Sequence, residues 1–281
     1  MINKNNIPKK SKIGVTNNFK ISRIKRKIKA SNPHKHDAYH ELIYLTEGAG
    51  FHTIDLTSYQ IETPSLFLVN AGEVHYWEFT KIPDGYVAIF KSDFLAHLSY
   101  KNTYSKFDQT DKRYFRIRDE HRFPFSSLFE LIKNEYEQDK EGSTRIIASS
   151  LELIFTQMGR LTKRNQSKET HPKEKTYRTF RKLLDEHLFD YHLVKKYADL
   201  LNITPKHLNE ITKERTQKTP SELIAEKRIL EAQRQLLYSS QTISEIAHQL
   251  GFSSPSHFGT FFKKNVGFTP DQYRTEKVTD I

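Results

Sequence analysis

The pattern of hydrophobic and polar positions changes its period once along the chain, near Phe125. From Phe19 to about Phe90, short runs alternate with period two and are separated by turn residues. Closely spaced short strands of this kind predict an antiparallel sandwich or barrel. The clearest of these runs are residues 41–45, 51–56, 65–69 and 85–90.

After Phe125 the apolar residues recur at helical spacing. Two apolar stripes predict amphipathic helices over residues 126–138 and 145–161. These helices either present a dimer face or pack against the barrel, and the pattern leaves both alternatives open. Composition and period together predict four parts: a disordered basic arm over residues 1–17, a barrel domain with C-terminal helices over 18–161, a polar linker over 162–175, and a helical domain over 176–281.

The helical domain carries one motif twice. Between Val194 and Pro270, two segments share an amphipathic helix with a central Ala, a short break and a second helix that a hydroxyl residue and Pro open. Matched positions lie 49 residues apart before the break and 50 residues apart after it. This plan predicts two helix-turn-helix units in one chain.

The residues expected at the helix ends support the two units. Thr204 and Ser254 are suitable N-caps, and the Pro that follows each of them suits a first helical position. Gly251 fits the left-handed turn of the second unit. Gln217 stands where the second unit has Gly267, so the first unit has to end its second helix without the most permissive residue.

A helix predicted over residues 221–238 joins the two units. At 1.5 Å per residue it is roughly 27 Å long. A rod of this length can hold two recognition helices about one DNA turn apart, roughly 34 Å. The chain would then read two adjacent major grooves of double-stranded DNA, at an asymmetric site because the two reading faces differ.

The outward positions of the two second helices differ in chemistry. Lys206 and Asn209 suit guanine and adenine edges, whereas Ser256 and Thr260 are small and suit thymine, so we expect stronger discrimination by the first unit. Glu210 either accepts from cytosine or pairs with Lys206 or Lys213. Lys213 and Lys263 suit phosphates. The candidate DNA-binding residues are Thr204, Lys206, His207, Asn209, Glu210, Lys213, Ser254, Ser256, His257, Thr260 and Lys263.

Charge alone is weak support for DNA binding, despite a net charge of +11 over 281 residues. Residues 1–30 hold ten Lys and Arg and no Asp or Glu, whereas residues 171–281 hold 18 against 14. The basic arm either is a solvated, charged edge or touches phosphates. The chain has no Cys, which excludes disulfides and thiolate metal sites. It has no apolar run of spanning length, so we expect a soluble cytoplasmic protein with no membrane partner.

The stretch from Ile243 to Arg274 resembles the signature of the AraC/XylS family of bacterial transcription regulators, and Arg228, Ala232 and Leu236 also fit. The resemblance implies a two-domain α+β chain, with an N-terminal cupin-like β-barrel sensor and an all-α DNA-binding domain. It implies a nucleoid-associated, sequence-specific regulator under the control of an unidentified small molecule, with RNA polymerase as a further partner. A homodimer, and whether the effector activates or represses, stay open.

The barrel partly fits the cupin motifs. His34, His36 and Glu41 have the spacing of the first motif, and His75 falls in the second. In metal-dependent cupins the matching residues bind a divalent metal, and this ligand set suits Fe, Mn, Ni or Zn. The alternative is a polar pocket for the effector, with no metal or other cofactor. The candidate effector-binding residues are His34, His36, Glu41, Tyr44, Phe51, His75 and Trp77.

Two other classes of protein compete with a regulator. One is a metal-dependent cupin enzyme with a DNA-binding tail, and the other is an architectural DNA protein without an effector. The chain has no nucleophile elbow, P-loop or dinucleotide fingerprint. We therefore assign no catalytic residue and expect no enzyme.

Overall fold

The computed structural model describes residues 7–10, 12, 18–37, 39–91, 94, 112–117, 124–161 and 172–278. Residues 8–166 form a barrel unit, and the residues from 167 onward form a helical unit. This boundary lies inside the predicted linker, and helix α5 begins at Pro172, ahead of the predicted start at 176. Among the described residues, no helix is both long and apolar enough to cross a membrane.

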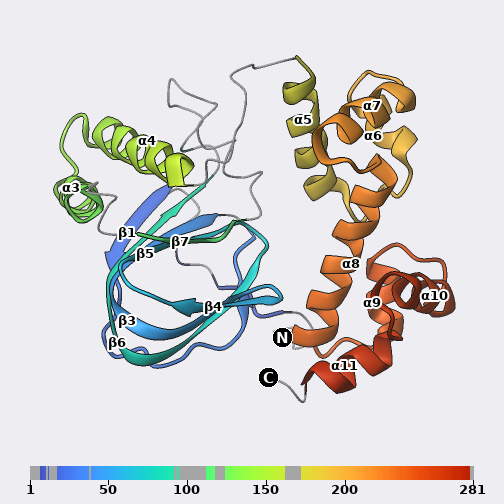
Figure 1. Cartoon of the computed structure of the whole chain (residues 1–281), viewed down its shortest axis with the longest axis horizontal. Coiled ribbons are helices and arrows are strands. Elements are labelled where there is room, and N and C mark those ends of the chain that lie inside the picture. Colours follow the sequence, from blue (N-terminus) through green and yellow to red (C-terminus); the bar gives the residue numbers. More distant parts are fainter. Residues whose placement is uncertain are drawn as a thin grey trace. The chain divides into compact units, whose positions relative to one another are not determined.

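The barrel unit is a strongly curved antiparallel sheet (Figure 1). Its strands are β1 (Phe19–Arg23), β2 (His34–Lys35), β3 (His40–Ile54), β4 (Thr57–Ile61), β5 (Ser65–Val69), β6 (Val74–Phe90) and β7 (Tyr114–Arg116). The order is β1-β6-β3-β5-β7, with β2 paired to β6 and β4 paired to β3. The long strands β3 and β6 pair from His40 opposite Phe90 to Ile54 opposite His75, through three irregularities in register. The sequence pattern did not predict β7.

Both faces of the central strands are buried, which explains their nearly continuous apolar runs. Leu42, Tyr44 and Leu66 belong to a core cluster that also contains residues of helices α3 and α4. Ile43 and Phe67, on the opposite face, belong to the interior cluster of the barrel. Side chains of successive strand residues point to opposite faces, so one strand supplies both clusters.

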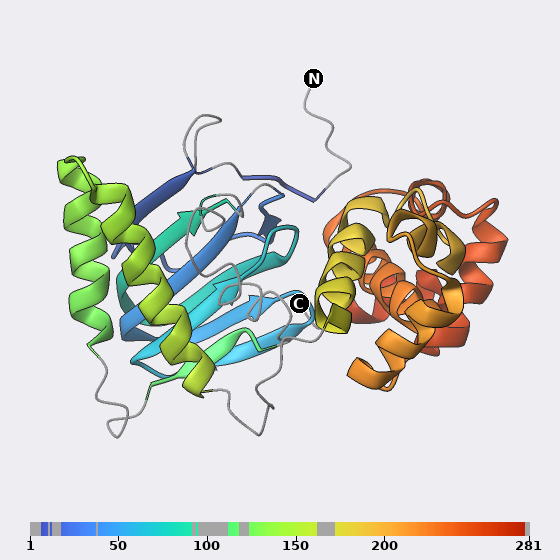
Figure 2. The same cartoon turned by 90° about the horizontal axis from the view of Figure 1, so that it is seen from above.

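Helices α3 (Phe125–Gln138) and α4 (Ser143–Leu161) run along the outer face of the sheet (Figure 2). Their buried stripes include Phe129, Leu151 and Phe155, all in the same core cluster. The predicted stripes therefore pack within the chain. Leu131, Ile146 and Leu153 remain exposed on these helices, and a homodimer stays a prediction.

The N-terminal arm is ordered where the structure describes it. Lys9 bridges in parallel to Lys35 of β2, and the backbone NH of Lys10 donates to the Lys35 carbonyl at 3.2 Å. The prediction of a disordered arm over residues 1–17 does not hold for residues 7–10 and 12. Backbone pairing needs no apolar side chain, so a polar, Lys-rich sequence gives no indication that the arm pairs with β2. The rest of the predicted arm lies outside the described residues.

The helical unit contains two helix-turn-helix pairs joined by a long helix (Figure 1). Its helices are α5 (Pro172–His187), α6 (Val194–Leu200), α7 (Pro205–Thr216), α8 (Pro220–Tyr238), α9 (Ile243–Gln249), α10 (Pro255–Val266) and α11 (Pro270–Val278). The predicted joining helix over 221–238 is confirmed within one residue at its start.

Helix α8 belongs to two separate cores. Leu223 and Ile224, near its start, pack in a cluster with α5, α6 and α7. Ala232 and Leu236, near its end, pack in a cluster with α9, α10 and α11. Because a single continuous helix supplies both clusters, the two helix-turn-helix pairs are fixed to one rod.

The turn of the second pair also contacts α8 and the segment that precedes α6. Arg228 of α8 donates from Nη2 to the carbonyl of Leu250 at 2.7 Å, and its guanidinium lies 4.0 Å from the centroid of the Phe252 ring. Gly251, with φ +72°, sits against the segment between α5 and α6. A Cβ there would overlap the His192 ring and lie 3.1 Å from the Phe189 carbonyl oxygen. Position 251 therefore requires Gly for space as well as for conformation.

The ends of the two recognition helices differ as the sequence predicts. Helix α7 ends at Gln217 with φ +61°, and α10 ends at Gly267 with φ +91°. Both residues have a left-handed backbone conformation. The NH of Gln217 donates to the Lys213 carbonyl, and the NH of Gly267 donates to the Lys263 carbonyl. A residue with a Cβ is strained in this region, so the first unit carries a local cost that the second avoids.

We predict that Gln217→Gly raises the free energy of unfolding of the helical unit by up to about 1 kcal/mol, because Gly adopts the left-handed turn without strain. The matched change Gly267→Gln should lower it by a similar amount. A Cβ at position 267 would meet no atom within 4 Å, so only the backbone conformation is tested. Urea titration followed by far-UV circular dichroism measures both. Identical midpoints for the three proteins would contradict the assignment.

Candidate functional site

Helix α7 presents a polar face opposite its buried residues. Leu208, Ile211 and Thr212 are buried, whereas the predicted contact residues on the other side are open to solvent. Of these, Lys206, His207, Glu210 and Lys213 are exposed and Asn209 is half-buried. The predicted inward and outward positions are therefore confirmed for the first unit.

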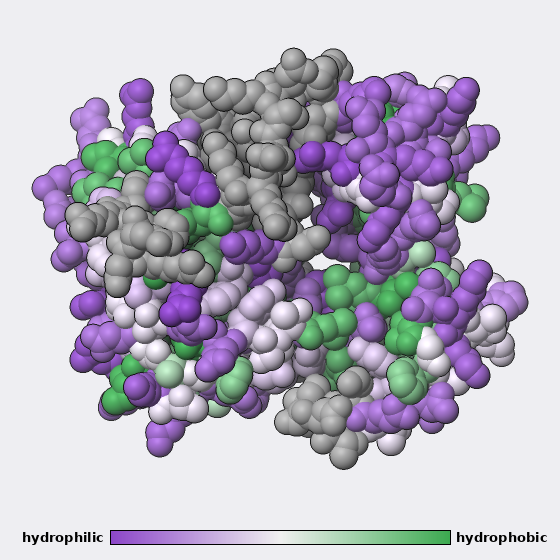
Figure 3. Space-filling model, viewed as in Figure 1, coloured by the Kyte–Doolittle hydropathy of each residue, from purple (hydrophilic) through white to green (hydrophobic). Residues whose placement is uncertain are grey.

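Helix α10 follows the same plan with smaller side chains. Phe258 and Phe262 are buried, whereas Ser256, His257, Thr260 and Lys263 are exposed. Phe261 is half-buried, and the Arg228 guanidinium lies 5.4 Å from the centroid of its ring. In Figure 3, hydrophilic residues dominate the part of the helical unit formed by α5, α6 and α7.

The N-cap residues hold the first turn of each recognition helix. Thr204 Oγ1 accepts from the NH of His207 at 3.1 Å, and Ser254 Oγ accepts from the NH of His257 at 3.2 Å. Both hydroxyl oxygens are therefore engaged by the helix itself. The capped N-terminus keeps the partial positive charge that favours a phosphate.

Two outward residues already have partners within the helical unit. Glu210 Oε2 lies 3.5 Å from His207 Nδ1, so its pairing partner is His207 rather than either predicted lysine. Thr260 Oγ1 donates to the Ser256 carbonyl at 3.0 Å. This hydrogen bond uses the hydroxyl proton and leaves the methyl group of Thr260 for an apolar contact.

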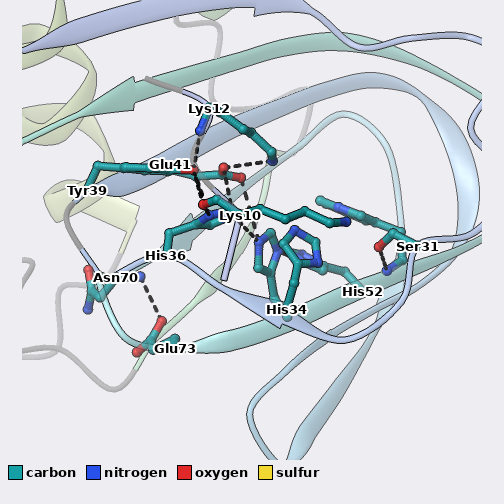
Figure 4. Close-up of polar contacts among 12 residues, drawn as sticks. Lys10, Lys12, Ser31, His34, His36, Tyr39, Glu41, His52, Asn70 and Glu73 are labelled. Atoms are coloured by element: carbon teal, nitrogen blue, oxygen red, sulfur yellow. Dashed lines mark hydrogen bonds and ion pairs between the residues drawn. The ribbon is translucent and has the colours of Figure 1, made fainter. Parts of the chain in front are cut away.

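The barrel unit gathers four of the predicted effector residues into one buried cluster (Figure 4). His36 Nε2 lies 3.1 Å from His75 Nε2 and 3.2 Å from Glu41 Oε1. His34 lies beside them, with its ring centroid 4.5 Å from that of His75 and the two rings tilted by 42°. His34 lies in β2 and His36 directly follows that strand, and both side chains are buried.

The N-terminal arm supplies a cation to this cluster. Lys12 Nζ lies 2.8 Å from Glu41 Oε1. The Lys10 carbonyl accepts from the Tyr39 hydroxyl at 3.0 Å and contacts His36 Nδ1 at 2.6 Å (Figure 4). Tyr39 and both lysines were absent from the candidate residues, because nothing in the local sequence indicates that the arm reaches the barrel interior.

His52 extends the cluster toward the barrel wall. Its Nε2 lies 3.1 Å from His75 Nδ1, and its ring stacks on Trp77 with centroids 3.4 Å apart. The sequence predicts Phe51 as a pocket residue instead, but Phe51 is 44% exposed. The alternation that places Ile54 inside also places His52 inside, so this signal was present in the sequence.

Of the three aromatic candidates for effector binding, Tyr44, Phe51 and Trp77, only Trp77 lies beside the cluster. Tyr44 faces the helices, where its ring stacks on Phe129 at 5.0 Å and its hydroxyl contacts Ser126 Oγ at 2.8 Å. Phe51 points outward at the surface. The prediction that Tyr44 and Phe51 line the pocket is therefore wrong. Both were assigned to the inner face of the sheet, whereas their side chains lie on its outer face.

Burial sets the charge of the histidines. It lowers the pKa of His34 from 6.5 to about 4, and it lowers the pKa of His75 well below the ordinary value. For Glu41, burial acts to raise the pKa, but the His36 hydrogen bond and the Lys12 charge keep it below its ordinary value. Burial therefore favours the neutral forms of His34 and His75, beside a carboxylate that its partners keep ionised.

We predict that the barrel loses stability as the pH falls from 7 to 5. The pKa of His34 is 6.5 in the unfolded chain and about 4 in the folded chain. Between these two values His34 is protonated only in the unfolded chain, so lowering the pH stabilises the unfolded state and the free energy of unfolding decreases. His34 alone should account for roughly 2 kcal/mol. Trp77, the one tryptophan of the chain, reports urea unfolding of the barrel by its fluorescence.

The matched control separates this effect from general acid sensitivity. His34→Asn should reduce the dependence on pH, whereas His207→Asn, at an exposed histidine of α7, should leave it unchanged. An unaltered slope in His34→Asn would contradict the assignment.

Both units match known protein families. Residues 27–86 match the AraC-like ligand binding domain, and residues 197–276 match a helix-turn-helix domain. The first range contains every effector candidate, from His34 to Trp77. The second contains every DNA-binding candidate, from Thr204 to Lys263. The two sets of candidate residues therefore fall in domains of the matching kind.

Two curated relatives match over most of the chain. The chain is 22% identical over 256 residues to the HTH-type transcriptional activator RhaS of Enterobacter sp. (strain 638), covering 87% of this chain and 88% of the relative. It is 23% identical over 250 residues to RhaS of Shigella sonnei (strain Ss046), with the same coverage. The solved structure of ToxT from Vibrio cholerae aligns with 92% of this chain and 98% of its own, at 16% identity and a TM-score of 0.43.

The fold, the two domain matches and the curated relatives agree. An antiparallel barrel that matches a ligand-binding domain precedes two helix-turn-helix pairs that match a DNA-binding domain. The chain belongs to the AraC/XylS family of transcription regulators.

Proposed function

We propose that the protein reads an asymmetric DNA site by inserting α7 and α10 into two adjacent major grooves, under the control of a small molecule bound in the barrel. The observation that carries this proposal is the pair of matched, solvent-exposed polar faces on two capped helices. Helix α8, which supplies both cores, joins them.

The length of α8 suits this geometry. Its 19 residues span about 28 Å at 1.5 Å per residue. One turn of DNA is about 34 Å, so a rod of this size with a recognition helix beside each end matches two successive grooves. The two exposed faces differ in sequence, so the site has no two-fold symmetry.

The first unit has the side chains that discriminate bases most strongly. Asn209 suits a bidentate contact with adenine, and Lys206 suits the acceptors of guanine. Glu210 accepts from cytosine once it leaves His207, its present partner at 3.5 Å. The second unit offers Ser256 and the Thr260 methyl group, which suits thymine.

The remaining candidates position the helices on the backbone. Lys213 and Lys263 lie near the C-terminal ends of α7 and α10 and suit phosphates. His207 and His257, in the first turns, are exposed and lie close to the capped N-termini that favour a phosphate. Thr204 and Ser254 act through the caps that they form.

The effector site is the interior of the barrel beside the histidine cluster. A small molecule alters DNA affinity only if it binds one arrangement of the chain better than another. By likeness to the RhaS activators, we propose that the protein activates transcription and contacts RNA polymerase in the cytoplasm, at the nucleoid. We propose no catalytic step for the barrel.

We predict that base substitutions in the half-site of α7 cost more affinity than those in the half-site of α10. The target duplex is first selected from random sequence with the full-length protein, and singly substituted duplexes are then titrated. Asn209→Ala should lose about 1–3 kcal/mol at one base pair and relax the preference there. Thr260→Ala should lose less. Equal or greater losses in the α10 half-site would contradict the assigned roles.

We predict that Lys213→Gln weakens binding equally for all sequences and reduces the slope of log affinity against log salt by about 1, because one phosphate contact is lost. Lys140→Gln is the matched control, since Lys140 is an exposed lysine of the barrel unit. A sequence-selective loss in Lys213→Gln, or the same loss in both variants, would contradict a phosphate role.

A further inference from the structure

The loop between β1 and β2 carries a cluster of exposed basic residues on the barrel unit. The NH of Ile28 donates to the Lys25 carbonyl at 3.1 Å, which closes a tight turn with Arg26 and Lys27 at its corners. Lys25, Arg26, Lys27 and Lys29 are all exposed. Like charges this close in the chain repel one another, so their arrangement favours a polyanionic partner that offsets the repulsion. We call residues 25–29 the basic turn.

The basic turn is held against β6 rather than solvated as a free tail. The Ile24 NH donates to the Gly85 carbonyl at 3.0 Å, and the Lys29 carbonyl accepts from the Phe79 NH at 2.7 Å. Hydrogen bonds to β6 therefore fix the chain on both sides of the turn. Binding of an anion by an ordered turn costs less conformational entropy than binding by a free tail.

The arginines of this region are neutralised within the barrel unit. Arg26 Nη2 lies 2.6 Å from Asp84 Oδ2, and Arg23 Nε lies 3.5 Å from Asp84 Oδ1. The Arg23 guanidinium also lies over the Tyr86 ring, 5.4 Å from its centroid. The two arginines therefore anchor the turn to the sheet.

The lysines of the basic turn have no such partner. Within the described part of the chain, no residue forms an ion pair or a hydrogen bond with the side chain of Lys25, Lys27 or Lys29. Lys81, in the β6 segment that lies between the two anchoring hydrogen bonds, is also exposed. These ammonium groups are available to a partner outside the barrel.

Positive charge outweighs negative charge around the basic turn. Glu47 lies opposite Asp84 in the sheet, and Glu78 bridges to Ala30 directly after the turn. These three acidic residues stand against six basic ones, which are Arg23, Lys25, Arg26, Lys27, Lys29 and Lys81. The region therefore keeps a positive surplus after its ion pairs are made.

The helical unit is weakly charged for a protein that binds DNA. Residues 171–281 hold 18 Lys and Arg against 14 Asp and Glu, whereas residues 1–30 hold ten and none. Phosphate contacts supply a large share of the affinity of proteins for DNA, because each contact releases condensed counterions. A chain that reads DNA through a weakly basic unit gains affinity if basic residues elsewhere also reach the phosphates.

We propose that Lys25, Lys27 and Lys29 bind the phosphate backbone of double-stranded DNA outside the two half-sites read by α7 and α10. This inference rests on the proposed function, because it requires DNA that the helical unit already holds. An irregular turn presents no helix or strand that fits a groove, so its lysines contact phosphates rather than base edges. The barrel unit then adds affinity without adding sequence preference.

The test is a titration of the full-length protein with two duplexes that share the selected site, read by fluorescence anisotropy at several salt concentrations. One duplex ends at the half-sites, and the other extends by about 15 base pairs on either side, roughly one and a half turns. We expect the extended duplex to bind more tightly and to steepen the slope of log affinity against log salt by about 2–3, since each phosphate contact contributes about 0.9. Equal slopes for the two duplexes would overturn the proposal.

A triple variant assigns the difference to the basic turn. Lys25→Gln, Lys27→Gln and Lys29→Gln together should weaken binding to the extended duplex at least about tenfold at roughly 100 mM salt and remove its steeper slope. Binding to the short duplex should hardly change. Trp77 fluorescence and circular dichroism check that the barrel is folded.

A matched triple variant controls for total charge. Lys140→Gln, Arg145→Gln and Arg160→Gln together remove the same charge from other exposed residues of the barrel unit, and both slopes should stay as in the parent. An equal loss in the two triple variants would contradict a role for the basic turn.

The parent slope on the extended duplex, if it persists in the basic-turn variant, would also overturn the proposal. A turn that only protects a sheet edge from association, or that binds an acidic protein, gives this result. A parent that selects no duplex from random sequence would instead refute the proposed function, so the two failures are distinct.

Discussion

The packing of α8 into two cores is the constraint on which the helical unit depends. Leu223 and Leu236 bury opposite ends of the same helix in different clusters, so neither helix-turn-helix pair can rotate without bending the rod. Arg228 adds a second restraint, because its guanidinium joins α8 to the turn after α9 through a hydrogen bond and a stacked ring. A protein built in this way presents two recognition helices in one fixed relation.

The barrel concentrates its polar chemistry where the sheet is most enclosed. Strand pairing places His34 opposite His75, and backbone carbonyls orient two of the rings through Nδ1. The described arm residues add a charge that the sheet itself does not supply. The same interior therefore combines buried imidazoles with one carboxylate and one lysine from the arm.

The helical unit was predictable from the sequence because its signals are local: N-cap residues, Pro at the first helical position and apolar spacing all act within a few residues. The restraint by Arg228 was not predictable, since its hydrogen bond joins residues 22 positions apart. The close approach of Gly251 to His192, which leaves no space for a Cβ, was not predictable either. In the barrel, alternation indicates His52 as an inward residue, but the facing of Tyr44 depends on where α3 packs. Lys12 reaches Glu41 through tertiary structure alone.

The most direct measurement is the dependence of DNA affinity on the spacing between the two half-sites. Inserting about five base pairs rotates one half-site to the opposite face of the duplex, since one turn is about 10 base pairs. A rigidly joined pair should then lose affinity nearly to the level of a duplex with a single half-site. Equal affinity for the original and the inserted duplex would contradict the fixed relation of α7 and α10.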